Sequence, residues 1–241
     1  MNNYGLIGYP LTHSFSQKYF EEKFKAENIN AKFTNFELRD IADFPKLIED
    51  NPNLKGLCVT IPYKEEIIDY LDFLEEETAA IGAVNCIKIY DGKLYGFNTD
   101  VWGIIETLVK RKFWATMILG TGGAAKAVNY CIGEVFEAPI VNVSRTAKEN
   151  VITYEQIDEE IMREVSLIVN TTPLGTFPNV KEYPNIPYHL LNESHTLFDL
   201  TYNPPETEFM KKGKAQGATV INGYDMLVTQ AEKAWQFWTD I

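Results

Sequence analysis

The sequence lacks several features on which whole classes of protein depend. It has three cysteines among 241 residues, so they cannot all pair within the chain, and their spacing makes no zinc site. No apolar run approaches the roughly 20 residues that span a bilayer. The first residues have neither the basic nor the long apolar segment of a signal peptide. We therefore expect reduced thiols, a cytoplasmic location and no membrane partner.

Positive charge is scarce as well. Lysine and arginine total 22 against 34 aspartate and glutamate residues, which gives a net charge of −12. Such a field repels a polyanion, so the composition argues against nucleic acid as a partner. A small anionic ligand is compatible with this charge where a few cations are placed locally. The composition leaves open whether the protein is a monomer or a homodimer.

Hydrophobic periodicity divides the chain into two parts near residue 99. The first part mixes strands and helices, and Asp91-Gly92 is a strong signal for a hairpin turn. Ser14 or Ser16 can cap its first helix. The patterns predict helices at 15–27 and 63–80 and strands at 4–8, 32–38, 54–60, 84–90 and 93–97.

The second part alternates regularly between strand and helix, which is typical of a doubly wound parallel sheet. Its first two helices are expected to begin near Thr99 and Gly123. A last amphipathic helix is expected over 223–240, where Trp235 and Trp238 are more typical of a core or interface than of a cofactor contact. Apolar runs predict strands at 116–119, 139–143, 165–170, 196–200 and 219–221.

The clearest functional motif is a glycine-rich turn between a predicted strand and a predicted helix. The segment Gly120-Thr121-Gly122-Gly123-Ala124-Ala125 fits the Gly-x-Gly-x-x-Gly/Ala pattern of dinucleotide-binding proteins. Gly120 permits the tight turn, Gly122 lets the backbone approach a pyrophosphate, and Ala125 allows close packing of helix and strand. The following helix would offer free N–H groups to the phosphates. A glycine-rich turn without a ligand is the alternative, which the strand–helix setting disfavours.

The next strand indicates which dinucleotide binds. In NAD sites an acidic residue at the end of this strand binds the ribose 2′-hydroxyl, whereas here the strand ends in Ser144-Arg145-Thr146. The guanidinium of Arg145 can pair with a 2′-phosphate, Ser144 and Thr146 add hydroxyl donors, and Lys148 lies close by. Arg145 could instead be a solvated surface residue. Because the missing acid and the added cation agree, the sequence favours NADP over NAD.

Four short polar patterns in the first part lie at the ends of predicted strands or the starts of predicted helices. They are Ser14 with Ser16, Thr60–Lys64, Asn85, and Asn98-Thr99-Asp100. Open α/β sheets bind ligands at such positions. Each pattern also has a structural alternative. The hydroxyl residues are typical helix caps, and a single lysine is more often a solvated cation.

In their order along the chain, these patterns resemble the motifs of the shikimate dehydrogenase family. The similar segments extend over nearly the whole sequence, which makes the set far more specific than any one member. They are Gly8–Ser16, Gly56–Lys64, Gly82–Asn85, Gly96–Gly103, Gly120–Ala125, Ser144–Thr146, Asn170–Gly175, Asp199–Tyr202 and Asn222–Gln230.

The resemblance implies an NADP-dependent oxidoreductase. Members of this family reversibly reduce 3-dehydroshikimate to shikimate with NADPH, a step in chorismate and aromatic amino acid biosynthesis. By this resemblance Lys64 and Asp100 would be the catalytic pair, and Leu200 and Gly223 would line the nicotinamide pocket. The hydroxyls and the carboxylate of the substrate would be held by Ser14, Ser16, Thr60, Asn85, Tyr202 and Gln230.

Together with the strand–helix pattern, the resemblance implies two α/β domains. Residues 1–102 with 222–241 would form the substrate-binding catalytic domain, and residues 103–221 a Rossmann-type NADP-binding domain. The C-terminal helix would return to the first domain because it carries Gln230. The substrate would lie in a cleft between the domains, and closure of this cleft would exclude water.

These residue types suit the chemistry. A hydride that arrives at a ketone carbon leaves negative charge on the oxygen, which a lysine ammonium can stabilise and protonate. In the reverse direction a neutral amine can take the proton from the alcohol. Asp100 could orient Lys64 and bind the reacting hydroxyl. A nearby carboxylate favours charged lysine and burial favours the neutral amine, so the protonation state of Lys64 is left open.

The sequence also departs from the family pattern. Cys58 stands in place of a usual asparagine, Gln17 in place of proline, Cys86 in place of threonine and Ser144 in place of asparagine. None of these changes removes the acid–base pair, but they leave the choice of substrate open. Two alternatives therefore stand beside an NADP-dependent shikimate dehydrogenase. One is a quinate/shikimate dehydrogenase with broader substrate or NAD use, and the other is a catalytically weak cofactor-binding sensor.

Overall fold

The chain folds into two compact α/β units. The computed structural model describes residues 1–11 and 14–240, so Thr12 and His13 of the Gly8–Ser16 motif lie outside the described residues. The first unit comprises Met1–Asp100 and Gln230–Ile241, and the second comprises Val101–Thr229. Each unit is built on one six-stranded sheet, as the sequence predicted for a two-part α/β protein.

The sheet of the first unit is mixed, with the strand order β2-β1-β3-β5-β6-β4. Strand β1 pairs in parallel with β2 and β3, whereas β5 is antiparallel to both β3 and β6. Asp91 and Gly92 have φ values of 49° and 71°, as a tight hairpin between β5 and β6 requires. The strands are β1 (Asn2–Gly8), β2 (Ala31–Glu37), β3 (Leu54–Val59), β4 (Phe73–Leu74), β5 (Cys86–Tyr90) and β6 (Lys93–Phe97).

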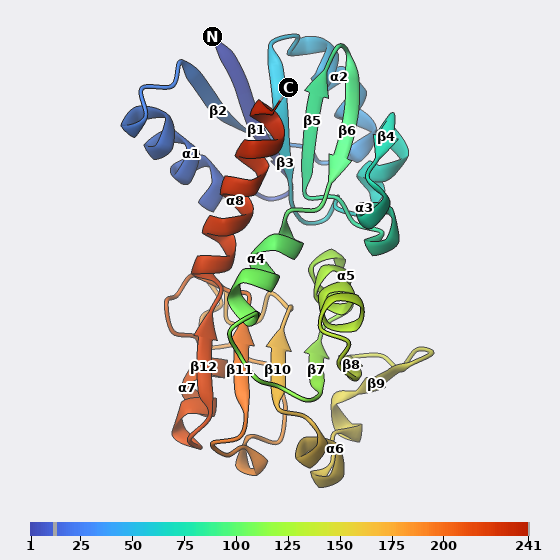
Figure 1. The fold of residues 1–241 in the computed structure, drawn as a ribbon, viewed down its shortest axis with the longest axis vertical. Helices are drawn as coiled ribbons and strands as arrows, with labels where there is room; N and C mark the ends of the chain where they lie inside the picture. Colours follow the sequence, from blue (N-terminus) through green and yellow to red (C-terminus); the bar gives the residue numbers. More distant parts are fainter. Residues whose placement is uncertain (12–13, 241) are drawn as a thin grey trace. The chain divides into compact units, whose positions relative to one another are not determined.

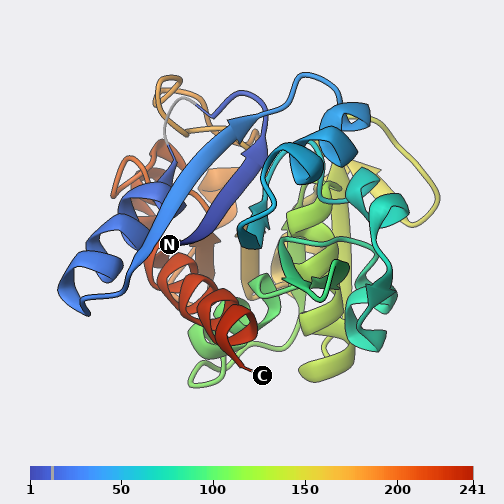
Figure 2. The same cartoon turned by 90° about the horizontal axis from the view of Figure 1, so that it is seen from above.

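Hydrophobic cores cover both faces of this sheet. On one face α1 (Phe15–Ala26) and the C-terminal part of α8 (Tyr224–Thr239) pack against β1 and β2. Trp238 belongs to this core: its ring stacks on Tyr4 at a centroid distance of 5.0 Å, and its indole donates to Ile87 O. On the other face lies α2 (Phe44–Asp50), which was not predicted (Figure 2). The C-terminal helix thus returns to the first unit, as expected.

The prediction of one helix over residues 63–80 is wrong. The segment forms the 3-10 turn Glu66–Tyr70, then β4, and then α3 (Glu76–Ile81). Strand β4 pairs with β6, and Phe73 stacks on Tyr95 with the ring centroids 4.8 Å apart. This pairing with a strand about 20 residues away overrides the local helical periodicity, because tertiary contacts outweigh propensity.

The sheet of the second unit is entirely parallel, with the order β12-β11-β10-β7-β8-β9. Figure 1 shows β12, β11, β10 and β7 side by side. The strands are β7 (Thr116–Leu119), β8 (Ile140–Ser144), β9 (Val151–Thr153), β10 (Leu167–Asn170), β11 (Thr196–Asp199) and β12 (Thr219–Asn222). The helices are α4 (Asp100–Leu108), α5 (Gly123–Tyr130), α6 (Glu159–Glu164) and α7 (Glu208–Ala215). The predicted doubly wound parallel sheet is confirmed.

Two further findings bear on the composition. Cys58, Cys86 and Cys131 are all buried, and none of them forms a disulfide. Within the described ranges, no helix combines the length and the apolar character that a bilayer crossing requires.

Candidate active site and cofactor site

Lys64 and Asp100 form a short ion pair within the first unit. Lys64 follows β3, and Asp100 is the first residue of α4. The distance from Lys64 Nζ to Asp100 Oδ2 is 2.6 Å, and the two side chains are only 16% and 6% exposed. Because water screens such a pair weakly, the carboxylate holds the ammonium in one place. The structure thus brings together the two side chains that the resemblance pairs, and their part in catalysis stays a prediction.

The backbone explains why residues so distant in sequence meet here. Val59 N donates to Asn85 O at 2.8 Å, and Asn85 N donates to Phe97 O at 3.1 Å. These bonds hold the end of β3, the start of β5 and the end of β6 side by side. Val84 N also donates to Lys64 O at 2.7 Å, which ties the lysine to the same place.

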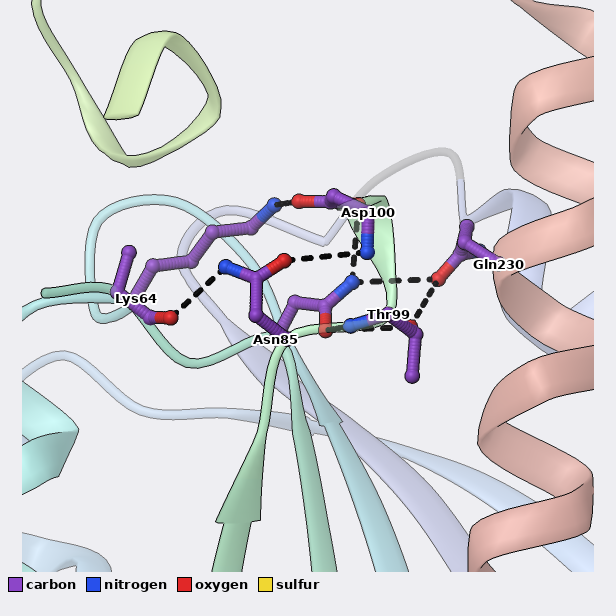
Figure 3. Close-up of polar contacts among 7 residues, drawn as sticks. Lys64, Asn85, Thr99, Asp100 and Gln230 are labelled. Atoms are coloured by element: carbon purple, nitrogen blue, oxygen red, sulfur yellow. Dashed lines mark hydrogen bonds and ion pairs between the residues drawn. The ribbon is translucent and has the colours of Figure 1, made fainter. Parts of the chain in front are cut away.

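The amide of Asn85 holds the second oxygen of Asp100. Asn85 Oδ1 accepts from Thr99 N at 2.7 Å, so the amide nitrogen is the group that points to Asp100 Oδ1, at 2.9 Å (Figure 3). Both oxygens of Asp100 therefore accept hydrogen bonds, one from Lys64 and one from Asn85. Such a set of donors matches an ionised carboxylate, which can only accept.

Gln230 on α8 belongs to the same buried cluster. Its Oε1 lies 3.4 Å from Asn85 Nδ2 and 3.4 Å from Thr99 Oγ1. Four residues named from the resemblance are thus together: Lys64, Asn85, Asp100 and Gln230. Thr99 also belongs to the cluster. The sequence placed it in the pattern Asn98-Thr99-Asp100 but gave it no role in the site, because a threonine before a helix is an ordinary cap. Its position directly before Asp100 in the sequence was the signal that could have indicated a role in the site.

Ser14 and Ser16 have different hydrogen-bond partners. Ser14 caps α1, where its hydroxyl accepts from Gln17 N at 3.1 Å, which is the structural alternative weighed for it. Ser16 forms a side-chain hydrogen bond with Cys58. Burial raises the pKa of the Cys58 thiol to about 12. The bond with Ser16 and the charge of Lys64 lower this pKa, whereas the charge of Asp100 raises it. Ser16 and Cys58 therefore lie near the ion pair.

Thr60 follows β3 and is half-buried. Its backbone N–H donates to Ile7 O at 3.0 Å, which extends the pairing of β3 with β1 by one residue. A Cβ added at Gly8 would collide with the Thr60 methyl, so glycine allows this close approach. Its contact with a substrate stays a prediction.

The glycine turn of the second unit has the geometry that a pyrophosphate needs. Gly120 follows β7 with φ of +112°, and an added Cβ would lie 2.5 Å from Thr171 Oγ1, so glycine is required. At Gly122, which caps α5, an added Cβ would meet nothing within 4 Å. The first N–H groups of a helix have no acceptor within the helix, and in α5 they belong to the residues that follow Gly122. Thr121 and Gly122 are exposed, and Gly123 and Ala124 are half-buried. These residues fit a dinucleotide phosphate.

The end of β8 presents the residues expected to bind a 2′-phosphate. Ser144 is half-buried and ends β8, while Arg145 and Thr146 are exposed. Burial raises the pKa of the Tyr154 phenol, and the positive charge of Arg145 opposes this rise. Lys148 bridges to Val151 at the start of β9, and its side chain is exposed too. The accessible guanidinium with a nearby ammonium fits a dianion.

The remaining predicted contacts, Leu200, Tyr202 and Gly223, also lie in the second unit. Gly223 is buried, and an added Cβ would collide with Leu200 O and lie 3.0 Å from Asp199 O. Glycine thus lets the chain pass close to the end of β11. Leu200 and Tyr202 are half-buried, and burial raises the pKa of Tyr202. Their contacts with nicotinamide or substrate stay predictions.

Asp199 is a second buried carboxylate; its segment, Asp199–Tyr202, resembles a family motif, but the sequence analysis assigned the aspartate no role. Its Oδ1 accepts from Asn170 Nδ2 and from Thr201 N, both at 3.0 Å, and its Oδ2 accepts from Thr207 Oγ1 at 2.6 Å. Burial raises the pKa of Asp199, and these bonds oppose the rise. Asn170 and Asp199 end neighbouring strands, so the cluster ties the carboxyl ends of β10 and β11 together.

Several known proteins similar to this chain are named shikimate dehydrogenases. The family profile described as "Shikimate dehydrogenase substrate binding domain" matches residues 6–87. A protein of Clostridium beijerinckii named shikimate dehydrogenase (NADP(+)) is 40% identical over 252 residues, which cover 100% of this chain and 93% of that protein. A crystal structure of a shikimate dehydrogenase in complex with NADP+ has a TM-score of 0.89 and 32% identity, covering 100% of this chain and 91% of that one. The shikimate 5-dehydrogenase of Thermus thermophilus in complex with NADP(H) and shikimate has a TM-score of 0.88 and 29% identity, covering 100% and 94%.

Proposed function

This chain belongs to the shikimate dehydrogenase family, and we propose that it catalyses the reversible NADPH-dependent reduction of 3-dehydroshikimate to shikimate in aromatic amino acid biosynthesis. The observation that carries the proposal is the buried ion pair of Lys64 and Asp100, with Nζ and Oδ2 2.6 Å apart and two amides beside it. An ammonium held in this way is a proton donor in a fixed position.

The first unit would bind the substrate. Ser14, Ser16, Thr60, Asn85 and Gln230 belong to it, and Tyr202, the remaining residue that the resemblance assigns to the substrate, belongs to the second unit. The side chains are hydroxyls and amides, which suit the several hydroxyls and the carboxylate of a small polyol acid. Buried polar groups reject a ligand that leaves them unpaired, so this set would select against analogues that lack a hydroxyl.

The second unit would bind the cofactor. The open space at Gly122, the N-terminus of α5 and the backbone of Gly120–Ala124 suit the pyrophosphate, and Arg145 with Ser144 and Thr146 suits a 2′-phosphate. Leu200 and Gly223 would lie along the nicotinamide. When bound, NADPH supplies the hydride.

The role of Lys64 follows from its donor group. In the direction of reduction, its ammonium would stabilise the negative charge that develops on the carbonyl oxygen and would give that oxygen a proton. Asp100, which is held by Asn85, would keep Nζ in position and would accept a hydrogen bond from the hydroxyl of the product. In the oxidation direction the neutral amine of Lys64 would take the same proton back.

A spectrophotometric screen tests the proposal. Purified protein is mixed with shikimate, quinate or related cyclohexene acids together with NADP or NAD, and the formation of reduced cofactor is followed. We expect turnover with shikimate and NADP, and a kcat about 10³-fold lower with the same pair after Lys64→Ala. An absence of turnover with every acid would contradict the proposal.

The same screen separates the alternatives. Turnover of quinate at a similar rate would indicate the broader quinate/shikimate dehydrogenase, and a preference for NAD would remove the role given to Arg145. Binding of NADP without any turnover would indicate a cofactor-binding sensor. The subunit number, monomer or homodimer, and the cytoplasmic location stay predictions.

A further inference from the structure

The hydrogen-bond polarity of the buried cluster can be determined from one backbone group. A backbone N–H can only donate, so the bond from Thr99 N at 2.7 Å identifies the Asn85 atom it reaches as the amide oxygen. Asn85 Nδ2 must then be the donor to Asp100 Oδ1 at 2.9 Å and to Gln230 at 3.4 Å. The Gln230 atom that faces Asn85 is therefore its oxygen, Oε1.

The hydroxyl of Thr99 adds a second constraint on the same oxygen. Thr99 Oγ1 lies 3.4 Å from Gln230 Oε1 and 3.1 Å from Asn85 Oδ1, and both of these atoms are acceptors. The hydroxyl can only donate to either of them. Thr99 is 0% exposed, Asn85 4% and Gln230 6%, so a reversed amide would leave donors facing donors without water to separate them.

We propose that Thr99 is a positioning residue for substrate binding: its hydroxyl holds Oε1 of Gln230, so that Gln230 presents its amide N–H group to an oxygen of the substrate. This inference rests on the proposed function. It gives the pocket a defined polarity, in which Gln230 donates and Asp100 accepts. Such a pocket suits a ligand whose hydroxyl groups both accept and donate.

Backbone and side chain of Thr99 have separate tasks in this arrangement. The backbone N–H holds Asn85 and, through it, Asp100, and every substitution except proline keeps this bond. The hydroxyl lies 3.1 Å from Asn85 Oδ1 and 3.4 Å from Gln230 Oε1, but only Asn85 also has the backbone bond, so Gln230 alone loses its Thr99 donor when the hydroxyl is removed. Removal of the hydroxyl should therefore weaken substrate binding and leave the proton transfer by Lys64 almost unchanged.

The test compares steady-state kinetics of the full chain and its Thr99 variants. We expect Thr99→Val to raise KM for shikimate about five- to ten-fold, as for one lost neutral hydrogen bond, with kcat within about two-fold of wild type. Thr99→Ser should keep KM within about two-fold of wild type, because it retains the hydroxyl. KM for NADP should not change in either variant. Should Thr99→Val fail to fold, Thr99→Ala removes the same hydroxyl without filling its place.

A matched control and a double variant distinguish this role from a general loss of stability. Thr78 in α3 is 1% exposed and its hydroxyl donates to Glu75 within its own segment, so Thr78→Val should leave KM unchanged. In a Gln230→Ala background, Thr99→Val should raise KM no further. Full additivity of the two changes, or a Thr99→Val variant that loses kcat at constant KM, would overturn the inference. If the wild type itself does not oxidise shikimate, the proposed function fails instead.

Discussion

The two units prepare their candidate sites in opposite ways. In the first unit, buried side chains bond to each other: Lys64 to Asp100, Asp100 to Asn85, and Asn85 to Gln230. In the second unit, the glycine turn offers backbone N–H groups and open space, and Arg145 at the end of β8 is exposed. The first site depends on side chains that bond to each other. The second depends on glycines, which leave space for a ligand, and on an exposed guanidinium.

A second contrast concerns the buried carboxylates. Asp100 has an ammonium at 2.6 Å, whereas the hydrogen bonds to Asp199 come from an amide, a backbone N–H and a hydroxyl, all neutral. The two buried aspartates thus have different surroundings: Asp100 begins α4 beside a cation, and Asp199 ends β11 among neutral donors. In the proposed function, the carboxylate with a cation beside it would position a proton donor, whereas the carboxylate with neutral donors alone ties two strand ends together. The comparison predicts how each unit responds to substitution.

The largest effect is expected where the side-chain chemistry of the first unit is removed. Lys64→Ala should lower kcat about 10³-fold, because it removes both the proton donor and the positive charge that stabilises the developing oxyanion. Fluorescence titration should show that NADP binds as in wild type, since the second unit is unchanged. Lys93→Ala, which removes an exposed ion pair with Asp72 in the same unit, is the control and should keep full activity. Equal kcat in Lys64→Ala and wild type would contradict the claim that the site of the first unit depends on this side chain.

The next effect is expected where a side chain is added to the second unit. Gly122→Val should raise the dissociation constant of NADP about ten- to one-hundred-fold, because its methyl groups would occupy space that protein atoms leave open. The protein should still fold, since an added Cβ meets nothing within 4 Å. Gly133→Ala, where an added Cβ makes only an ordinary contact at 3.7 Å with Ile140, is the control. Unchanged NADP binding in Gly122→Val would show that the turn is only structural.

A charge deletion in the second unit should have a smaller and more selective effect. Arg145→Ala should lower the ratio of kcat/KM for NADP to that for NAD about ten- to one-hundred-fold, or about 1.5–3 kcal/mol for a charge-assisted hydrogen bond. Turnover with NAD should hardly change. Kinetics with both cofactors measure this ratio, and Arg163→Ala, an exposed arginine paired with Glu159 in the same unit, serves as the control. A preference for NADP that survives Arg145→Ala would assign the 2′-phosphate to other residues.

The smallest effect concerns the carboxylate without a cation. Burial raises the pKa of Asp199, so the folded protein favours the protonated carboxyl. The stability that this carboxyl contributes is fully present below the ordinary carboxyl pKa of about 3.9 and is lost as the pH rises through the folded-state pKa. Asp199→Asn does not titrate. At acid pH it should lower the free energy of unfolding by about 1 kcal/mol, and this deficit should shrink as the pH rises.

Urea unfolding of wild type and Asp199→Asn at a series of pH values measures the difference. Other titrating groups are common to both proteins and cancel. A deficit that grows with pH would mean that the hydrogen bonds from Asn170, Thr201 and Thr207 outweigh burial, and that this carboxylate is held as an anion after all.

Much of the second unit could be predicted from sequence because its signals are local. A run of apolar residues, a glycine turn and a helix in succession predict a parallel strand followed by a phosphate-binding turn, and β7, Gly120–Gly122 and α5 follow this order. Local signals failed in the first unit at residues 63–80, where β4 depends on β6. They placed Thr99 and Asp199 in motifs but did not identify their clusters, because Gln230 and Asn170 come from segments far away in the chain.

The sequence by itself determined which groups are available: the glycines of the turn, the cation at the end of β8, and the lysine, aspartate and amides of the ordered motifs. These depend on residue type and short spacing, which the chain carries wherever it folds. Only the tertiary structure decided that Lys64 and Asp100 meet at 2.6 Å and that Thr99 fixes the polarity of Asn85 and Gln230. The physical reason is that hydrogen bonds act over about 3 Å, and only the pairing of strands and the return of α8 bring groups up to 145 residues apart within that distance.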